Sequence, residues 1–219
     1  MFYILLIIYK MRICYIILTC ELYLPTRVKY LLETSLKNIN KNDIYFLSYK
    51  SIEPNIYGWN TPDNYEGCPL KYIRFFQNMK LEYDWYYFMD DDTFIFPNRL
   101  HKFLINYNKD DSLYIGLRCK NYSFPIYMSG GAGFLLTKSL YLSLINYIRN
   151  TSEDKLLVSI YGDYSIGMWL SNIEKKIIDL DIFNSNTHKN NDELEYCISF
   201  HYLKTKEQYF FYDNFNLHS

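Results

Sequence analysis

The sequence predicts an α/β protein built on a mainly parallel sheet. Two observations lead to this fold class. Short apolar runs rich in β-branched and aromatic residues alternate along the chain with stretches whose apolar residues recur at helical spacing. Hydrophobic residues make up 49% of the 219 positions and charged residues 21%, which excludes a disordered chain. Strands that alternate with helices form parallel sheets, with the helices packed on both faces.

Two strands and one helix are expected first. Residues 13–19 and 43–48 are expected to be strands, because their apolar runs 13–18 and 44–47 are unbroken, as in strands whose two faces are both buried. Pro25 opens a helix between them, because proline is tolerated in a first turn and the apolar residues that follow lie three and four apart. Residues 51–68 contain two prolines and two glycines, so we expect a loop there.

A second helix begins at Pro69. The apolar run 85–89 after it predicts a strand that leads directly into three aspartates. The remaining elements follow from the same two patterns. They are a helix over 97–107, a strand over 114–117, a helix over 138–149, a helix that begins near residue 163 and a strand over 176–180.

No internal repeat and no linker interrupts this alternation, so residues 11–219 are expected to form one domain. Residues 1–10 form a short apolar extension before it. Lys10 and Arg12 interrupt the apolar sequence there, whereas a membrane-spanning helix needs about 20 apolar residues. We therefore expect weak or absent membrane association and favour a soluble, cytoplasmic protein, with an anchor through this extension as the alternative.

The charge and the cysteines exclude other classes. A formal net charge of -1, with no basic tail, does not suit a protein that grips nucleic-acid phosphates. The five cysteines are scattered and include no C-x-x-C pair, so neither a zinc site nor a dense disulfide framework is indicated.

Asp90-Asp91-Asp92 is the strongest functional signal. Three adjacent carboxylates at the end of an apolar strand repel one another, and a hard cation such as Mg²⁺ or Mn²⁺ relieves that repulsion. The carboxyl end of a strand in an open α/β sheet is also where ligands bind. A solvated acidic turn is the alternative. The haloacid dehalogenase pattern D-x-D-x-T fits poorly, because Thr93 directly follows the last aspartate.

Three glycines, Gly130, Gly131 and Gly133, lie close together in the segment 129–133. They form neither a dinucleotide-binding G-x-G-x-x-G motif nor a P-loop. Glycine lets the backbone approach a ligand closely or permits a turn with positive φ. The segment is therefore either a ligand-facing loop or a tight turn.

Asp163 and His201 each allow two interpretations. Asp163 lies where a loop becomes a helix, and it suits an N-cap as well as a general base that faces a cleft. His201 lies in an apolar, strand-like segment. Its ring is either a packing residue or a Mn²⁺ ligand, since imidazole binds that ion. Spacing alone does not separate these alternatives.

Taken in order, the motifs resemble the Fringe-like β-1,3-glycosyltransferases, a group that includes the core 1 galactosyltransferases. The resemblance covers about residues 13–204. It rests on Thr19-Cys-Glu, Pro25-Thr-Arg-Val28, Lys71-Tyr72, Asp84-Trp85, Asp90-Asp91-Asp92-Thr93, Gly130-Gly131-Ala132-Gly133-Phe134, Gly162-Asp163 with Gly167, and Ser199-Phe200-His201-Tyr202.

The resemblance implies a GT-A fold, which is a Rossmann-like sandwich that binds a nucleotide sugar, usually a UDP-sugar, together with Mn²⁺ or Mg²⁺. It implies that Asp92 and His201 are the metal ligands. Asp90 and Asp91 would face the nucleotide ribose or metal-bound water. The glycine-rich loop, through Gly130, Gly131 and Gly133, would line the donor-sugar pocket.

The resemblance further implies an inverting transfer of the sugar to an acceptor hydroxyl of a glycan or glycoprotein, in a β-1,3 linkage, with Asp163 as the catalytic base. Members of the group usually carry a second acid just before this aspartate, where this chain has Gly162. An inactive nucleotide-sugar-binding or glycan-binding module of the same fold is the alternative. The intact acidic triplet, together with Asp163 and His201, argues against such a module.

Overall fold

The computed structural model describes residues 11–52, 54–120, 124–184, 196–204 and 206–215. The N-terminal extension expected over residues 1–10 lies outside this part of the chain. Within the described residues, no helix is both long enough and apolar enough to cross a membrane.

A central sheet of seven strands forms the middle layer, in the order β3-β2-β1-β4-β7-β6-β8. The pairs β1–β2, β1–β4, β2–β3 and β6–β8 are parallel, whereas β7 runs antiparallel to both β4 and β6. The predicted mainly parallel sheet is thus confirmed. The strands are β1 (Ile13–Leu18), β2 (Ile44–Ser48), β3 (Ile56–Gly58), β4 (Trp85–Asp90), β6 (Leu113–Gly116), β7 (Phe134–Thr137) and β8 (Lys176–Asp179).

The two central strands are buried on both faces, which explains their unbroken apolar sequences. In β1, Cys14 and Ile16 pack into the core on one face, and Tyr15 and Ile17 pack into the core on the other. The register pairs Leu18 with Asp90, so β1 and β4 end at the same edge of the sheet. The residues that follow β1 and β4 therefore lie close together at that edge.

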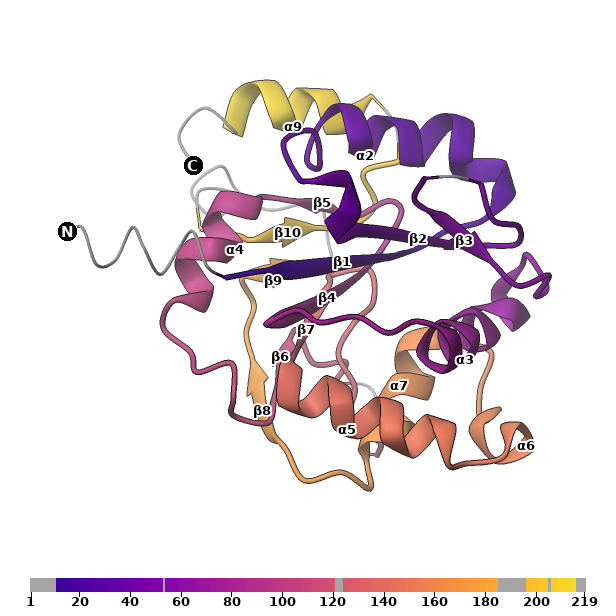
Figure 1. Ribbon diagram of the computed structural model, residues 1–219. Coiled ribbons are helices and arrows are strands. Elements are labelled where there is room, and N and C mark those ends of the chain that lie inside the picture. The colour runs from indigo at the N-terminus through magenta and orange to yellow at the C-terminus, as the bar shows by residue number, and fades with distance from the viewer. Residues whose placement is uncertain (1–10, 53, 121–123, 185–195, 205, 216–219) are drawn as a thin grey trace.

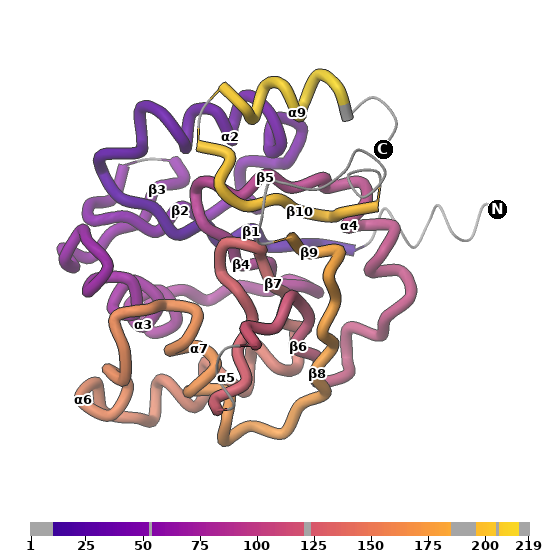
Figure 2. Tube along the Cα trace, turned by 180° about the vertical axis from the view of Figure 1, so that it is seen from behind, coloured from indigo at the N-terminus to yellow at the C-terminus, as the bar shows by residue number. Residues whose placement is uncertain are grey.

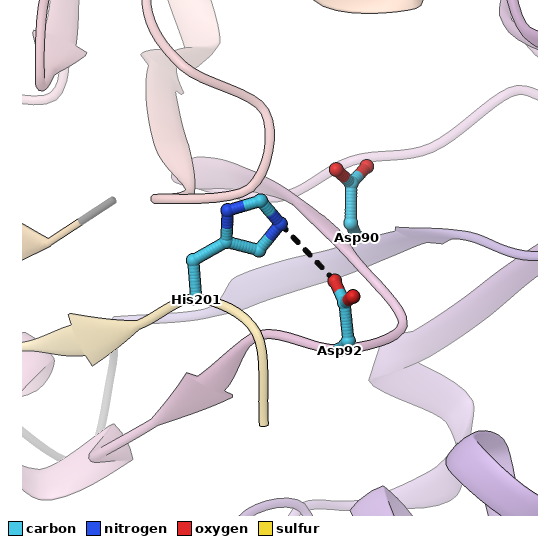
Figure 3. A group of neighbouring side chains, drawn as sticks. All are labelled: Asp90, Asp92 and His201. Carbon is cyan, nitrogen blue, oxygen red and sulfur yellow. Dashed lines mark ion pairs between the residues drawn. The ribbon is translucent and has the colours of Figure 1, made fainter. Parts of the chain in front are cut away.

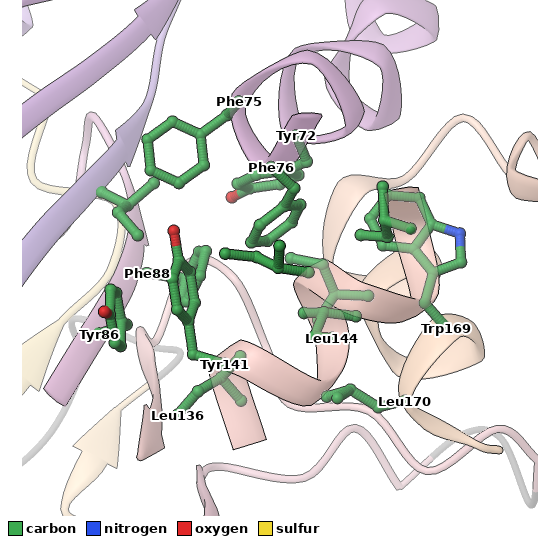
Figure 4. Packing of buried hydrophobic residues seen from close by; sticks show 14 of the residues in the cluster. Tyr72, Phe75, Phe76, Tyr86, Phe88, Leu136, Tyr141, Leu144, Trp169 and Leu170 are labelled. Atoms are coloured by element: carbon green, nitrogen blue, oxygen red, sulfur yellow. The ribbon is translucent and has the colours of Figure 1, made fainter. Parts of the chain in front are cut away.

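Three helices cover one face of the sheet, below it in Figure 1. They are α3 (Cys68–Asn78), α5 (Lys138–Arg149) and α7 (Gly162–Leu170), with the short α6 (Glu153–Leu156) beside them. Figure 4 shows the aromatic side chains that fill this layer. Tyr86 of β4 stacks on Tyr141 of α5 with ring centroids 3.4 Å apart, and Phe76 meets Trp169 of α7 edge to face.

The opposite face carries α2 (Lys29–Glu33), α4 (Pro97–Leu104), α9 (Glu207–Phe215) and a second sheet. The second sheet has the order β5-β10-β9, from β5 (Phe94–Ile95), β10 (Ser199–Phe200) and β9 (Phe183–Asn184). Both views of the chain place α9 alongside α2 and outside this small sheet (Figures 1 and 2). The backbone N–H of Leu203, which follows β10, donates to the Asp92 carbonyl at 2.9 Å, so this segment lies beside the turn that follows β4.

Three local features differ from the sequence prediction. β3 lies inside the segment predicted as a loop, and β7 follows the glycine-rich segment directly. The helix that Pro25 opens is shorter than expected and begins with a π-helical turn over Leu24–Val28. Three single turns of 3-10 helix, Glu21–Tyr23, Lys41–Asp43 and Tyr65–Gly67, complete the described elements.

Candidate functional site

The candidate site is a cavity of about 570 Å³ at the carboxyl ends of β1 and β4. Thr19, which follows β1, and Asp90, which ends β4, both line it. The turn after β4 is tied to the glycine-rich loop, because the Thr93 hydroxyl donates a hydrogen bond to the Gly131 carbonyl at 2.8 Å. The cavity therefore lies where an open α/β sheet binds its ligands.

Asp90, Asp92 and His201 converge in this cavity from two separate parts of the chain. One ligand atom from each of the three lies within 4.8 Å of the others. His201 Nε2 lies 3.2 Å from Asp92 Oδ1, and Figure 3 shows the ring pointing at that carboxylate with Asp90 beside it. Two carboxylates and an imidazole at this separation are a set of atoms that can hold a divalent cation.

The surroundings of Asp90 and Asp92 push their pKa values in opposite directions. Burial and the negative charges of Asp163, Asp92 and Asp91 raise the pKa of Asp90 well above its usual value. Among the described residues, no hydrogen bond or ion pair engages the Asp90 carboxylate. Burial also opposes ionisation of Asp92, but the hydrogen bond with His201 and nearby positive charge lower its pKa overall. A bound cation would therefore do most to stabilise the ionised form of Asp90.

Asp91 points away from this group and is held by two side chains near the end of β1. Thr19 Oγ1 donates to one of its oxygens at 2.6 Å, and Arg27 pairs with the other at 2.7 Å. Arg27 also lies 3.3 Å from an Asp92 oxygen and rests on the ring of Tyr23. Burial raises the pKa of Asp91 in spite of these two hydrogen bonds. Arg27 therefore joins the first helix to the acidic turn.

Lys71 is almost fully buried at the floor of the cavity. Its Nζ donates to the Thr19 carbonyl at 2.8 Å and to an Asp63 oxygen at 2.7 Å. Asp63 in turn accepts from the backbone N–H of Glu21 at 2.7 Å. A buried ammonium needs such partners, because a lone charge is expensive to remove from water. This network fixes the chain just after β1.

Two positions of the glycine-rich loop require glycine because other side chains approach the backbone closely there. A Cβ added at Gly131 would lie 2.1 Å from the His201 ring, and one at Gly133 would lie 2.0 Å from the Tyr87 hydroxyl. Gly133 also has φ +80°, which favours glycine. Close approach of neighbouring side chains and the positive φ of Gly133 therefore account for these two glycines, and Gly130 is the glycine of the loop that lines the cavity.

Asp163 is not the N-cap that its position in the sequence also suggested. The helix α7 begins at Gly162 with Tyr161 as its N-cap, which makes Asp163 the second helical residue. One carboxylate oxygen accepts from the backbone N–H of Tyr164 at 2.8 Å, and the other accepts from Gly130 at 3.0 Å. Burial raises its pKa, and these two hydrogen bonds oppose that shift. The side chain connects α7 to the glycine-rich loop.

The structure brings most of the residues that the sequence singled out to one cavity, but Gly131 and Gly133 are not among the residues that line it. Asp90, Asp91, Asp92, Gly130, Asp163 and His201 all line the same cavity. Sequence reasoning gave no role to Arg27, Lys71 or Asp63. Arg27 and Lys71 lie within motifs that carry the family resemblance, and that is the signal from which they could have been found. No sequence signal pointed to Asp63, because it lies in a segment that was predicted to be a loop.

A model of the Fringe-like family matches residues 10–213. The chain belongs to the Fringe-like family. Over 68 residues this Fringe-like chain is 37% identical to the glycoprotein-N-acetylgalactosamine 3-beta-galactosyltransferase 1 of Xenopus laevis. The match covers 31% of the chain and 19% of that relative, so the chain corresponds to about a fifth of the relative's length.

The fold of this Fringe-like protein is the GT-A fold of glycosyltransferases. A glycosyltransferase involved in glycosylation of the major capsid of PBCV-1 superposes with a TM-score of 0.50 at 15% identity, over 89% of this chain and 98% of that one. The bifunctional glycosyltransferase WbbM also reaches 0.50 at 12% identity, over 93% of this chain and 49% of its own. The chain thus combines the Fringe-like family and the GT-A fold with a group of two aspartates and a histidine that could hold a metal ion.

Proposed function

We propose that the protein is an inverting, metal-dependent glycosyltransferase that moves a sugar from a UDP-sugar to an acceptor hydroxyl. The observation that carries the proposal is that one cavity holds both a cation-binding group and a separate aspartate. Asp90, Asp92 and His201 form the first, and Asp163 is the second. Metal-assisted displacement of a diphosphate needs both parts, because the leaving group gains negative charge while the incoming hydroxyl loses a proton.

The cavity suits a nucleotide sugar in size and charge. Its volume of about 570 Å³ lies within the range of ~300–1,000 Å³ that is common for small-molecule sites. Arg27, Lys71 and Lys204 line it, so positive charge stands beside the acidic turn. A diphosphate can interact with the exposed Lys204, as well as with a cation held by the carboxylates, whereas Lys71 is already paired with Asp63.

The residues present fit a divalent cation. The Asp90 carboxylate is ion-paired with no described residue, while three further carboxylates raise its pKa. Asp90, Asp92 and His201 would hold Mn²⁺ or Mg²⁺, and Asp91 would remain with Arg27 and Thr19. When bound, the cation supplies positive charge that offsets the charge of the departing UDP.

Asp163 would act as the general base. The acceptor oxygen forms a bond to the anomeric carbon, and the bond from that carbon to the phosphate oxygen breaks, its electron pair leaving with UDP. The acceptor hydroxyl proton passes to an Asp163 oxygen. Attack on the face opposite the leaving group inverts the anomeric centre. The backbone N–H groups of Gly130 and Tyr164 keep this carboxylate in place.

The family and the Xenopus relative support the finer assignment of a β-1,3 linkage to a glycan or glycoprotein, with galactose as one donor sugar to test first. The test is a panel of UDP-sugars assayed for UDP release with Mn²⁺, with and without an acceptor. We expect one donor to release UDP and excess chelator to stop the release. Undiminished release in chelator would overturn the metal assignment, and no release from any donor would overturn the transferase.

A further inference from the structure

Tyr202 directly follows the proposed metal ligand His201 and has two unusual features. Its ring stacks on the His201 ring, with ring centroids 3.7 Å apart and an angle of 24° between the planes. Its backbone φ is +65°, in the left-handed region that bulky side chains rarely adopt. Tyr202 also lines the cavity of the candidate site. A residue with an unfavourable backbone beside a candidate ligand indicates a function for that backbone.

The conformation of Tyr202 is imposed by the chain on either side of it. A positive φ is unfavourable for tyrosine, because its Cβ comes too close to the carbonyl oxygen that follows. Such a conformation persists where the surrounding structure enforces it. The backbone N–H of His201 donates to the Asn184 carbonyl at 3.1 Å, and that of Leu203 donates to the Asp92 carbonyl at 2.9 Å. These two hydrogen bonds hold the backbone that directs the Tyr202 ring onto His201.

The His201 ring lies between Tyr202 and the backbone of Gly131. A Cβ added at Gly131 would lie 2.1 Å from Cε1, 2.2 Å from Nε2 and 2.3 Å from Nδ1 of that ring. Nearly equal distances to three ring atoms place Gly131 over a face of the ring, because a neighbour in the ring plane would be much closer to one atom than to the others. Tyr202 stacks on a face as well, and there is no room for both on the same one. The imidazole is therefore held on both faces.

This arrangement leaves the edge of the imidazole free to bind. Nε2 lies on that edge, 3.2 Å from Asp92 Oδ1, and Figure 3 shows the ring pointing at that carboxylate. Rotation about the Cβ–Cγ bond of His201 would drive the ring into Gly131 on one side and into Tyr202 on the other. Tyr202 is itself 53% exposed, so burial alone does not account for where its ring lies.

We propose that Tyr202 is a positioning residue, whose ring holds the His201 imidazole against Gly131 so that Nε2 faces Asp92 and the metal group. This role rests on the proposed metal-dependent function, in which His201 is a ligand. Metal-binding histidines are commonly oriented by a hydrogen bond to the second ring nitrogen. Here a stacked ring on a left-handed backbone would do the same work from the face of the imidazole.

The experiment compares four forms of the full chain: wild type, Tyr202→Asn, Tyr202→Phe and Tyr196→Asn. Asparagine removes the ring but tolerates a positive φ, so the turn to Leu203 is kept. Phenylalanine keeps the stacked ring and removes only the hydroxyl. Tyr196 provides the matched control, because it is a 74% exposed tyrosine of the same C-terminal segment and does not line the cavity. Thermal melting establishes that each variant is folded.

The first measurement is made in chelator and needs no metal. Proton NMR detects the contact between the His201 ring and the Gly131 α-protons. We expect wild type, Tyr202→Phe and Tyr196→Asn to show this contact and Tyr202→Asn to lose it, because its imidazole is free to turn. An unchanged contact in Tyr202→Asn would overturn the proposal, since Gly131 and the backbone would then suffice to hold the ring.

The second measurement uses Mn²⁺ with UDP. Calorimetry gives the affinity, and pulsed electron paramagnetic resonance detects the coupling of Mn²⁺ to a ligand nitrogen. Tyr202→Asn should bind Mn²⁺ about tenfold more weakly and lose most of the nitrogen coupling, as expected when a partner that orients a ligand is removed. Tyr202→Phe should restore both, and Tyr196→Asn should match wild type. Wild-type affinity in Tyr202→Asn, or no rescue by Tyr202→Phe, would overturn the proposal.

The two measurements separate this proposal from the proposed function. A wild type that shows nitrogen coupling and releases UDP, beside an unchanged Tyr202→Asn, would refute the role of Tyr202 alone. A wild type that binds Mn²⁺ without nitrogen coupling would refute His201 as a ligand, and with it both the proposed metal group and this role.

Discussion

Asp163 combines a structural and a chemical role that a single substitution can separate. Asparagine has one side-chain oxygen, so Asp163→Asn can keep a hydrogen bond from Tyr164 or from Gly130. It cannot accept the acceptor proton, and loss of a general base lowers the rate by about 10²–10⁴-fold. We expect Mn²⁺–UDP binding close to wild type and acceptor-dependent transfer reduced by that factor. Near-normal transfer would show that the base lies elsewhere.

Asp163→Asn should also change how folding stability depends on pH. Because the folded pKa of Asp163 is raised, this carboxyl contributes stability that is fully present below its unfolded pKa of about 3.9. That contribution is lost as the pH rises through the folded pKa. Asp163→Asn does not titrate, so its melting temperature should gain on that of wild type as the pH rises above about 4 in chelator. A difference that shrinks with rising pH would contradict the raised pKa.

Gly131 leaves room for the ring of His201, which we propose as a metal ligand. An alanine there would place its Cβ 2.1 Å from the His201 ring, whereas one at Gly130 would lie 3.3 Å from Asp163. Gly131→Ala should therefore move the ring and weaken Mn²⁺ binding about tenfold or more, close to the effect of His201→Ala. Gly130→Ala should affect it far less. Calorimetry of Mn²⁺ with UDP compares the three variants, and equal affinity in Gly131→Ala and wild type would refute this reason for the glycine.

The acidic triplet, the glycine loop, Asp163 and His201 could be found from the sequence because each stands out from its neighbours in type or spacing. The different contacts that each of these residues makes could not be predicted from the sequence. Asp90 and Asp91 have the same side chain, yet Asp90 faces His201 and Asp91 faces Thr19 and Arg27. That difference depends on which way each carboxylate points after the strand ends. The pairing of Lys71 with Asp63 depends on a loop conformation that no local pattern indicates.

Helices and strands were predictable where periodicity was strong and long. The core strands β1 and β4 and the helices α3 and α5 lie close to their predicted ranges. β3 has three residues and is defined by its backbone pairing with β2, so it left no apolar signature. The strand β7 was not predicted, because it ends at Thr137 and α5 begins at the next residue. Short pairings of this kind are set by the tertiary fold.

The small sheet and α9 support the segment that carries His201, the proposed metal ligand. His201 directly follows β10, and its backbone N–H donates to the Asn184 carbonyl at 3.1 Å. Phe211 of α9 packs on Phe200 and Phe94 of this sheet. Phe211→Ala should cost about 3–5 kcal/mol of folding stability and weaken Mn²⁺ binding with it.

Phe210 provides the control for this helix, since it is the exposed neighbour of Phe211. Phe210→Ala should change the free energy of unfolding much less. Urea unfolding of both variants, alongside Mn²⁺ titration, gives the comparison. If Phe211→Ala lost stability but bound Mn²⁺ as tightly as wild type, the small sheet would not be what positions His201.

The metal-free molecule concentrates negative charge at one edge of its sheet although its formal net charge is only -1. Burial raises the pKa values of Asp90, Asp91 and Asp163, and neighbouring carboxylates raise those of Asp90 and Asp91 further. Arg27 offsets part of this through Asp91 and Asp92, and Lys71 is committed to Asp63. Folding without a cation therefore carries an electrostatic cost that the proposed cation would remove, and stability would then be linked to metal binding.

This linkage predicts opposite behaviour for two neighbouring aspartates. Asp90 has no described partner and a raised pKa, so Asp90→Asn should melt above wild type in chelator at neutral pH. Asp92 has a lowered pKa and pairs with His201 and Arg27, so Asp92→Asn should melt below it. Mn²⁺ at a hundred times its Kd should stabilise wild type by about 2.7 kcal/mol, which is roughly 5–11 °C for a chain of this length. Both variants should lose that rise. Thermal melting of the three proteins, with chelator and with Mn²⁺, tests these expectations. An Asp90→Asn variant that Mn²⁺ still stabilises as much as wild type would show that Asp90 is not a metal ligand. An Asp90→Asn variant that melts below wild type in chelator would show that the Asp90 carboxylate has a stabilising partner.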